Sequence, residues 1–229
     1  MRKIDKQPEP RAWRDYRTTP GVRYQSQPCL IEALLEEQGY ICAYCERRIP
    51  YQDVPGQEDY RIEHLSSQAK AREEGDNSDL DYNNMVICCP GNITKDGPAH
   101  YHCDKRKGMK PLVISPLSEA MMRSIRFTDS GLIKSTDAKL DEELGEEGLN
   151  LNDGMLRNNR RETWLTVIEG LNKMGWTKRH VEQVLECWSD RHEWQYETQD
   201  GMKTVHAYYP YCSMVVFMLS RKLRQWEGK

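Results

Sequence analysis

The sequence predicts an α+β fold, in which a small zinc-stapled core of two strands and one helix precedes a mainly helical region. The first observation is the cysteine pair in "ICAYC" at 41–45, which a second group of cysteines follows between 88 and 103. The second is the short alternating segments between these groups, and the third is helical apolar periodicity after residue 154. We therefore expect an arm and zinc-containing domain at 1–118, and a hairpin with helices at 119–229.

The first half should contain an extended arm, a helix, two strands and a second short helix. Prolines and a glycine punctuate 1–27, which predicts turns and extended segments. The segment 28–39 begins with a proline and ends with a glycine around one apolar stripe, so it should be a helix. "YRIEHL" at 60–65 and "NNMVICC" at 83–89 alternate like strands, and "CDKRKG" at 103–108 should open a helix.

The second half should consist of one hairpin and three helices. "IRFTDSGLIKS" at 125–135 has a turn sequence between two short apolar segments, and "DAKLDEELGEEG" at 137–148 should be an exposed acidic connector. Amphipathic helices are expected at 155–174, 177–189 and 210–226. No separate group of catalytic residues occurs here, so we expect this half to form a core and to dock a partner.

Composition excludes several classes of protein. The 229 residues are 30% charged with a net charge of −3, which argues against coating nucleic acid by bulk charge. The longest apolar run, "MVVFML" at 214–219, is far shorter than the roughly 20 residues that span a bilayer. The opening "MRKIDKQPEP" lacks the apolar segment of a secretory signal. We expect a cytoplasmic protein without membrane association.

Four of the eight cysteines have the pattern of a structural zinc site. Reduced thiols are expected in the cytoplasm, and tetrahedral zinc needs two ligand pairs that tertiary structure brings together. Cys42 and Cys45 supply one pair, and Cys89 and Cys103 the other. Cys88 is the alternative to Cys89, because adjacent residues of a strand face opposite sides.

Other interpretations of the cysteines remain open. A redox CxxC pair would need a thioredoxin-like βαβ context, which the sequence lacks. His100 and His102 could replace one of the cysteine ligands. Cys29, Cys187 and Cys212 lie in apolar helical stretches and should be small buried residues.

Basic residues concentrate beside the cysteine and histidine motifs. They are Arg47, Arg48, Arg61, Lys105, Arg106, Lys107 and Lys110. Such a cluster is either an ordinary solvated surface or a local set of phosphate contacts.

The order of the short motifs resembles that of the HNH nuclease family. "CAYC", "IEHL", "LDYNNMVICC" and "HCDKRKG" follow the ββα-metal (HNH, His-Me finger) arrangement, in which structural zinc flanks the nuclease motif. The resemblance implies hydrolysis of phosphodiester bonds, with His64 as general base and Asn84 orienting its ring. Glu63 and Asp104 would hold a catalytic Mg²⁺ or Mn²⁺, and Lys107 would contact a neighbouring phosphate. Many family members have histidine where this chain has Asp104, but an aspartate oxygen suits both cations.

The resemblance is greater still to the PtuB subgroup of Septu and retron anti-phage systems. It rests on the same motifs together with "MRKIDKQPEP", "YRTTPG" and "LLEEQGYICAYCERRI", so it is strong in the first half and weak in the helical half. It implies an effector endonuclease that acts on DNA or tRNA with a PtuA-type ATPase. In the retron case, the partners would include a reverse transcriptase and its msDNA.

The alternative function is a zinc-ribbon module that binds nucleic acid or protein and cleaves nothing. Such a module would keep the four cysteines and the basic cluster. It would not need Glu63, His64, Asn84 and Asp104 in this order.

Overall fold

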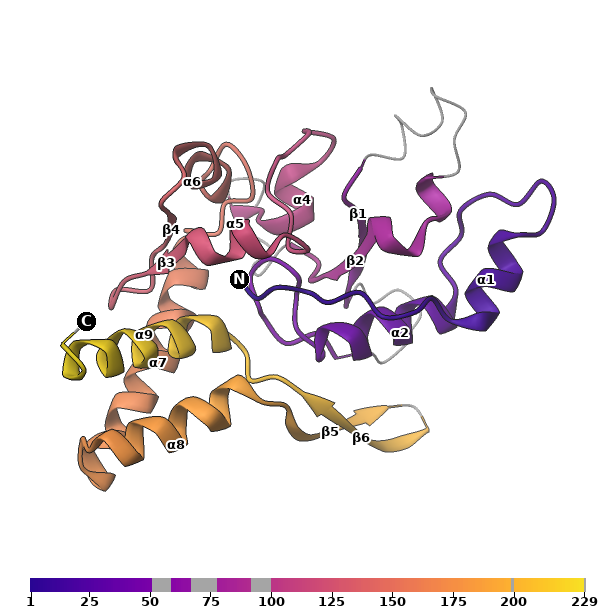
Figure 1. The fold of residues 1–229 in the computed structure, drawn as a ribbon. Coiled ribbons are helices and arrows are strands. Elements are labelled where there is room, and N and C mark those ends of the chain that lie inside the picture. The colour runs from indigo at the N-terminus through magenta and orange to yellow at the C-terminus, as the bar shows by residue number, and fades with distance from the viewer. Residues whose placement is uncertain (51–58, 67–77, 92–99, 199, 229) are drawn as a thin grey trace.

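The chain has an α+β fold, as the sequence predicts. The computed structural model describes residues 1–50, 59–66, 78–91, 100–198 and 200–228. The first half contains α1 (Arg11–Arg17), α2 (Pro28–Gln38), β1 (Arg61–His64), the 3₁₀ turns η1 (Ser78–Leu80) and η2 (Tyr82–Asn84), β2 (Met85–Cys88) and α4 (Cys103–Lys107) (Figure 1). The second half contains α5 (Glu119–Ser124), β3 (Ile125–Phe127), β4 (Ile133–Ser135), α6 (Ala138–Leu144), α7 (Gly154–Met174), α8 (Lys178–Ser189), β5 (His192–Thr198), β6 (Gly201–Ala207) and α9 (Cys212–Trp226).

The strands form antiparallel pairs, and the first pair is the scaffold of the candidate site. In the β1–β2 hairpin, Glu63 pairs with Val86 and His64 pairs with Met85. Strand alternation therefore directs Glu63 and His64 to opposite faces of the hairpin. Two side chains of α4 contact β1, and α2 packs along β2. Both expected strands and the short helix that follows them are present, as is α2 with its left-handed cap at Gly39.

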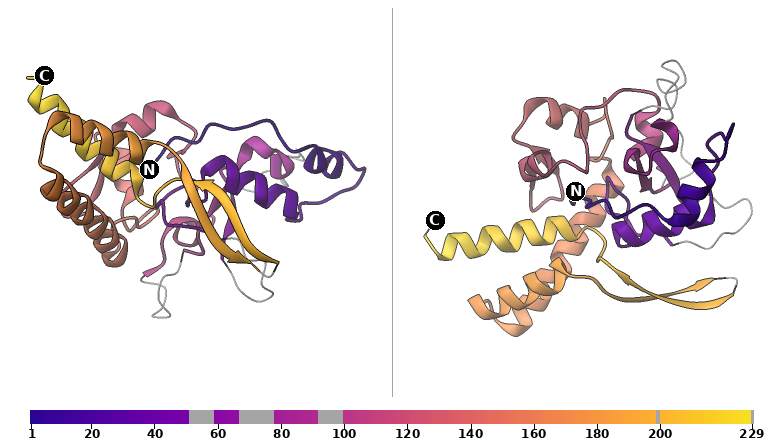
Figure 2. Two further views of the ribbon diagram at one scale, coloured as in Figure 1. Left: turned by 90° about the horizontal axis from the view of Figure 1, so that it is seen from below. Right: turned by 45° about the vertical axis from the view of Figure 1, so that its right-hand side comes forward.

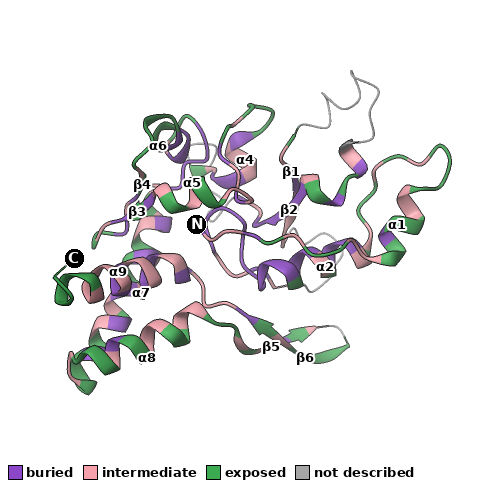
Figure 3. Ribbon diagram, viewed as in Figure 1, coloured by how far each residue is buried: buried purple, intermediate pink, exposed green. Residues whose placement is uncertain are grey.

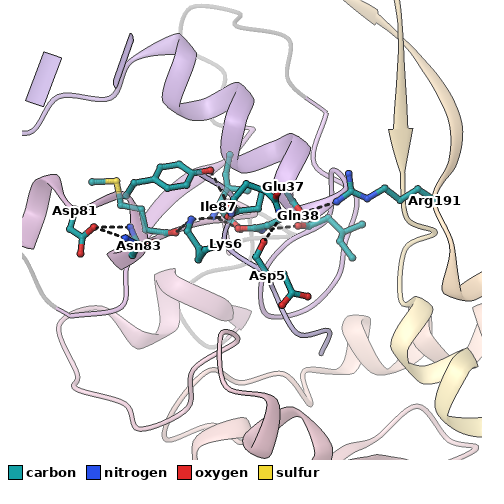
Figure 4. A network of polar contacts seen from close by, with 12 residues as sticks. Asp5, Lys6, Glu37, Gln38, Asp81, Asn83, Ile87 and Arg191 are labelled. Carbon is teal, nitrogen blue, oxygen red and sulfur yellow. Dashed lines mark hydrogen bonds and ion pairs between the residues drawn. The ribbon is translucent and has the colours of Figure 1, made fainter. Parts of the chain in front are cut away.

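The end of α2 is joined to β2 by buried polar side chains (Figure 4). The Gln38 amide accepts a hydrogen bond from the Ile87 N–H at 2.7 Å and donates to the Ile87 carbonyl at 2.8 Å, as a neighbouring strand would. The Glu37 carboxylate accepts from Lys6 at 2.7 Å, and its backbone carbonyl accepts from Arg191 at 2.9 Å. Segments from both halves of the chain therefore meet at this helix end.

The 1–27 segment is not simply an extended arm. It contains α1, whose Trp13 is fully buried and donates its indole N–H to the Leu80 carbonyl. The expectation failed because the apolar residues of this segment are too few to show periodicity, and contacts with the rest of the chain order them.

The acidic segment 137–148 is also not an exposed connector. It contains α6, which Asp137 caps and which buries Leu140 and Leu144. The carboxylate of Glu143 is buried as well, and accepts hydrogen bonds from the backbone N–H groups of Val113 and Ile114. The prediction failed because it relied on the high charge of the segment and overlooked the helical spacing of Leu140 and Leu144.

The helical half matches the expected order of elements, with one addition. The 125–135 hairpin is present as β3 and β4, and α7, α8 and α9 lie close to the predicted ranges. The β5–β6 hairpin was not expected from the sequence, and it extends from the helices alongside the first half (Figures 1 and 2). Its Trp194 and Tyr196 rings contact Tyr40, at centroid distances of 6.1 Å and 6.2 Å.

Buried apolar residues from the two halves of the chain pack together. One hydrophobic cluster includes residues from α2, β2, α7 and α9, so 1–118 and 119–229 share a core (Figure 3). Cys212 belongs to the buried set, but Cys29 is only partly buried and Cys187 is exposed, contrary to expectation. Within the described parts of the chain, no helix combines the length and apolarity needed to cross a membrane.

Candidate functional site

The four predicted zinc ligands meet in space. The Sγ atoms of Cys42, Cys45, Cys89 and Cys103 all lie within 4.8 Å of one another, and all four residues are buried. Three of the sulfur–sulfur distances are 3.7, 3.8 and 3.9 Å. Sulfurs about 2.3 Å from a central zinc ion would be about 3.8 Å apart at the corners of a tetrahedron. The cluster therefore has the size and donor set of a closed structural zinc site.

Cys89, and not Cys88, completes this cluster. Cys88 is the last residue of β2 and is fully buried, but it does not belong to the group of four sulfurs. His100 is not a substitute ligand, because its Nδ1 lies 3.1 Å from the Asp153 carboxylate. His102 is fully buried, and its Nδ1 lies 3.1 Å from the Cys103 sulfur, so it contacts the cluster from outside the four.

The electrostatics of the four thiols favour a bound cation. Burial raises the pKa of Cys45 and of Cys103 well above the ordinary value. Burial opposes ionisation of Cys42 too, but hydrogen bonds from the neighbouring thiols, Cys103 foremost, hold its pKa well below that value. Without a cation, Cys42 would thus ionise most readily, while Cys45 and Cys103 would stay protonated. A bound dication would stabilise all four cysteines as thiolates.

Backbone contacts from both halves of the chain hold the cluster. The Cys42 N–H donates to the Arg47 carbonyl at 2.9 Å, which closes the turn around the first pair. The Cys103 N–H donates to the Leu149 carbonyl at 2.8 Å. One ligand is therefore positioned by a residue from outside the predicted zinc-containing domain.

A pair of acids lies between β1 and α4. Glu63 is buried and forms an ion pair with Lys107, while Tyr44 donates its hydroxyl to the same carboxylate at 3.3 Å. Asp104 forms an ion pair with Arg61 at 2.7 Å. The carboxyl groups of Glu63 and Asp104 are themselves in hydrogen-bonding contact.

The two acids shift each other's pKa in opposite directions. Burial, followed by the hydrogen bond and the charge of Asp104, raises the pKa of Glu63 to about 8. Burial also acts against ionisation of Asp104, but the hydrogen bond from Glu63 and the contact with Arg61 hold its pKa below the ordinary value. The environment therefore favours the carboxylate form of Asp104, whereas at Glu63 burial and the charge of Asp104 act against the carboxylate that the ion pair with Lys107 stabilises.

His64 follows Glu63 in β1 but lies in a different environment from the two acids. Its Nε2 lies 3.1 Å from the Asp79 carbonyl, and its ring contacts the Tyr24 ring edge-to-face at 4.6 Å. Burial lowers the pKa of His64, and the Asp79 carbonyl and the charge of Asp104 offset this only in part. Because a carbonyl can only accept, Nε2 carries the proton of the neutral ring and Nδ1 carries the lone pair.

Asn84 lies at the same end of the hairpin. Its amide accepts a hydrogen bond from the Ser66 N–H at 2.7 Å and donates to the Ser66 carbonyl at 3.1 Å. These bonds fix the chain just after His64 at the end of β1, so Asn84 positions the backbone that carries the imidazole.

The predicted basic cluster does not form one exposed surface. Lys107 is buried against Glu63, so it neutralises an acid where an exposed phosphate contact was expected. Arg48 binds the Tyr208 carbonyl at 2.5 Å and lies over the Trp194 ring. Other members make contacts with nearby backbone or rings: Lys105 with Tyr101, Arg106 with Glu146 and Lys110 with Glu147.

Glu63 and Asp104 fit a hard divalent cation in donor type, but they are only two ligands. In the described residues, the four cysteines are the only group of three or more side chains with metal-ligand spacing. Mg²⁺ often binds to one or two carboxylates and takes its remaining ligands from water and substrate phosphate. A cation here would also have to compete with Lys107 and Arg61 for the two carboxylates.

Sequence reasoning missed the contacts of two residues in this site. Arg61 lies two residues before Glu63 on the same strand, so alternation could have placed both on one face. Tyr44, inside the CxxC motif, gave no signal of its contact with Glu63.

Comparison of the chain with protein-family models finds no match, and comparison with curated proteins finds none either.

Proposed function

We propose that the chain is a metal-dependent endonuclease of the HNH type that hydrolyses phosphodiester bonds in DNA or tRNA. The observation that carries the proposal is the meeting of Glu63 and Asp104 where β1 faces α4, with His64 next to Glu63 in the chain. A strand pair and a following helix, joined by a four-cysteine cluster, support the acids and the imidazole. The zinc would have a structural role, because all four of its ligands are protein sulfurs.

Each residue of the site has a separate role in the proposed reaction. His64 would accept a proton from the attacking water at Nδ1, since burial keeps the ring neutral. Glu63 and Asp104 would hold Mg²⁺ or Mn²⁺, which supplies charge stabilisation at the phosphate when bound. Lys107 and Arg61 would balance the acids in its absence. Asn84 would keep the end of β1 in position.

The resemblance to the PtuB subgroup extends the proposal to anti-phage defence. The chain would then be the effector subunit of a complex with a PtuA-type ATPase, in a Septu or a retron system. This part rests on the sequence motifs alone.

A second function, that of a non-catalytic zinc module, is favoured by one observation. Both acids already have basic partners, Lys107 for Glu63 and Arg61 for Asp104. A binding module could use these ion pairs only to attach α4 to β1, with no need for a catalytic cation.

Cleavage assays on matched variants separate the two functions. The zinc-loaded protein, with and without an ATPase partner, is incubated with supercoiled plasmid or total tRNA in Mg²⁺ or Mn²⁺. His64→Ala should lower the cleavage rate by about 100-fold or more, because it removes a general base. Asp104→Asn should raise the Mg²⁺ concentration needed for half-maximal activity.

The control is His206→Ala, which removes an exposed imidazole from β6 and should keep full activity. Zinc content should be the same in all variants, and each should unfold cooperatively above the assay temperature, although loss of the buried His64 ring should lower the thermal midpoint of His64→Ala. Equal cleavage by the wild type and His64→Ala would contradict the nuclease assignment, as would an absence of cleavage by the wild type under every condition.

A further inference from the structure

A groove of about 990 Å³ is lined by residues of α5, β3 and α9 and by the first three residues of the chain. Its apolar lining residues, which we call the floor, are the partly buried Met122, Val216 and Phe217 and the buried Ile125 and Phe127. None of the candidate-site residues lines it, so the groove is separate from the zinc cluster and from the acids.

The charged lining residues of the groove, which we call the rim, are mostly basic. Six basic residues and a single acid, Glu119, line it, whereas the whole chain has a net charge of −3. The six are Arg2, Lys3, Arg123, Arg126, Arg221 and Arg224.

Half of these basic residues have an acidic partner. Lys3 pairs with Asp5, Arg123 with Glu119 and Arg221 with Asp129. Among the residues that the structure describes, no carboxylate pairs with Arg2, Arg126 or Arg224. The groove therefore has an excess of positive charge that groups on this chain do not balance.

The floor and the rim are held in place by contacts with each other. Phe217 packs against Phe127 at a centroid distance of 5.9 Å, and the guanidinium groups of Arg126 and Arg221 lie 5.9 Å and 6.0 Å from its ring. Arg126 also donates to the carbonyls of Arg123 and Ile125, at 2.7 Å and 2.9 Å. A ligand would thus meet basic groups and an apolar surface that are already ordered, which lowers the entropy cost of binding.

We propose that this groove docks an acidic amphipathic helix of a partner protein. The apolar face of such a helix would cover Met122, Val216 and Phe217, and its flanking carboxylates would meet Arg126 on β3 and Arg224 on α9. A nucleic-acid duplex fits less well, because its phosphates would pair with the arginines but would leave the apolar floor uncovered. The inference does not depend on the chain being a nuclease.

The test measures binding of a defined peptide to the full-length protein by fluorescence anisotropy. The probe is a fluorescein-labelled peptide of about 18 residues, or five helical turns, made of Leu, Ala and Glu with leucines at helical spacing. We expect saturable binding at micromolar concentration that weakens as salt is raised. A scrambled peptide of the same composition should bind at least about tenfold more weakly, because it has no apolar face.

Two variants connect the binding to the groove. Arg126→Glu with Arg224→Glu, at two exposed positions, should weaken peptide binding by about tenfold or more. The matched control is Arg11→Glu with Arg23→Glu, which makes the same charge change at exposed positions in and after α1 and should leave affinity unchanged. Both variants should keep the thermal midpoint of the wild type.

Three results would overturn the proposal. These are failure of the helical peptide to bind, equal binding of the scrambled peptide, and equal loss of binding in both double variants. A labelled DNA duplex that binds more tightly than the peptide, and that Arg126→Glu with Arg224→Glu releases, would identify the groove as a nucleic-acid surface instead.

Discussion

Cys88 and Cys89 are adjacent and both buried, yet only Cys89 belongs to the four-sulfur cluster. Cys88 is the final residue of β2 and pairs with Arg61, while Cys89 lies just beyond the strand. The one-residue difference changes the direction of the side chain, because successive residues of extended backbone face opposite sides. The two cysteines should therefore respond differently to substitution.

We predict that Cys89→Ala loses most of its zinc, whereas Cys88→Ala keeps about one zinc ion per chain. Removal of one of four thiolates opens the coordination sphere, but Cys88 contributes only packing. Metal analysis after gel filtration in the presence of a weak chelator measures the difference. Retention of zinc by Cys89→Ala, together with its loss in Cys88→Ala, would reverse the assignment.

The raised pKa of Glu63 makes stability depend on pH. The raised pKa of Glu63, about 8, means that the folded protein binds more protons than the unfolded chain between the ordinary glutamate pKa and about 8. The contribution of this group is thus fully present at low pH and is lost as the pH rises through that interval. Glutamine cannot ionise and removes the dependence.

We predict that Glu63→Gln gains stability relative to the wild type between pH 5 and pH 8, by on the order of 2 kcal/mol. Denaturant unfolding of zinc-loaded protein, without added Mg²⁺ or Mn²⁺, measures the difference at each pH. Glu193→Gln, at an exposed position on β5, should follow the wild type. A constant difference between Glu63→Gln and the wild type would show that Glu63 is ionised throughout.

At the scale of elements, the C-terminal end of α2 joins the helix to the β5–β6 hairpin. Gly39 caps α2 in the left-handed conformation, at φ 63°, and its carbonyl accepts from the Tyr208 N–H at 3.0 Å. A Cβ on Gly39 would lie 2.4 Å from the Tyr208 ring. The glycine is needed for the backbone conformation and also for the close approach of the hairpin.

We predict that Gly39→Ala lowers the free energy of unfolding by about 2–4 kcal/mol, since it adds a steric clash to backbone strain. Gly21→Ala is the control, because Gly21 also has a positive φ, 76°, but a Cβ at this position would meet no atom within 4 Å. Gly21→Ala should lower the free energy of unfolding by only about 1 kcal/mol. Urea denaturation measures the free energy of unfolding of both variants. An equal loss of stability in the two would mean that the Tyr208 ring moves away from the added methyl group of Gly39→Ala without an energetic cost.

At the scale of the whole molecule, the two halves stabilise each other. The Leu149 carbonyl holds the Cys103 N–H, and the Glu46 carboxylate accepts from the Ser213 N–H at 3.0 Å. Residues from both halves belong to one hydrophobic cluster. The predicted division at residue 118 therefore passes through a shared core.

We predict that a fragment of residues 1–118 does not fold with the stability of the full chain. Its zinc should be removed at a lower chelator concentration, and its thermal midpoint should be lower or absent, because the cut exposes buried apolar surface. Addition of residues 119–229 as a separate chain should restore both properties in part. A 1–118 fragment with the zinc affinity and midpoint of the full protein would establish it as an independent domain.

The sequence by itself determined the features that depend on neighbouring residues. Pro28 and Gly39 marked the ends of α2, apolar periodicity predicted the helix at 177–189, and the cysteine spacing identified the four-cysteine cluster apart from the choice between Cys88 and Cys89. Capping, periodicity and ligand spacing act over a few residues, so a local pattern records them.

Only the tertiary structure decided which distant residues meet. It paired Lys107 with Glu63, buried α6 despite its charge, and placed the unexpected β5–β6 hairpin against Tyr40. The candidate site was thus predictable as a set of residues but not as an arrangement of charges. The physical reason is that burial and ion pairing depend on long-range packing of the whole chain, which no short stretch of sequence records.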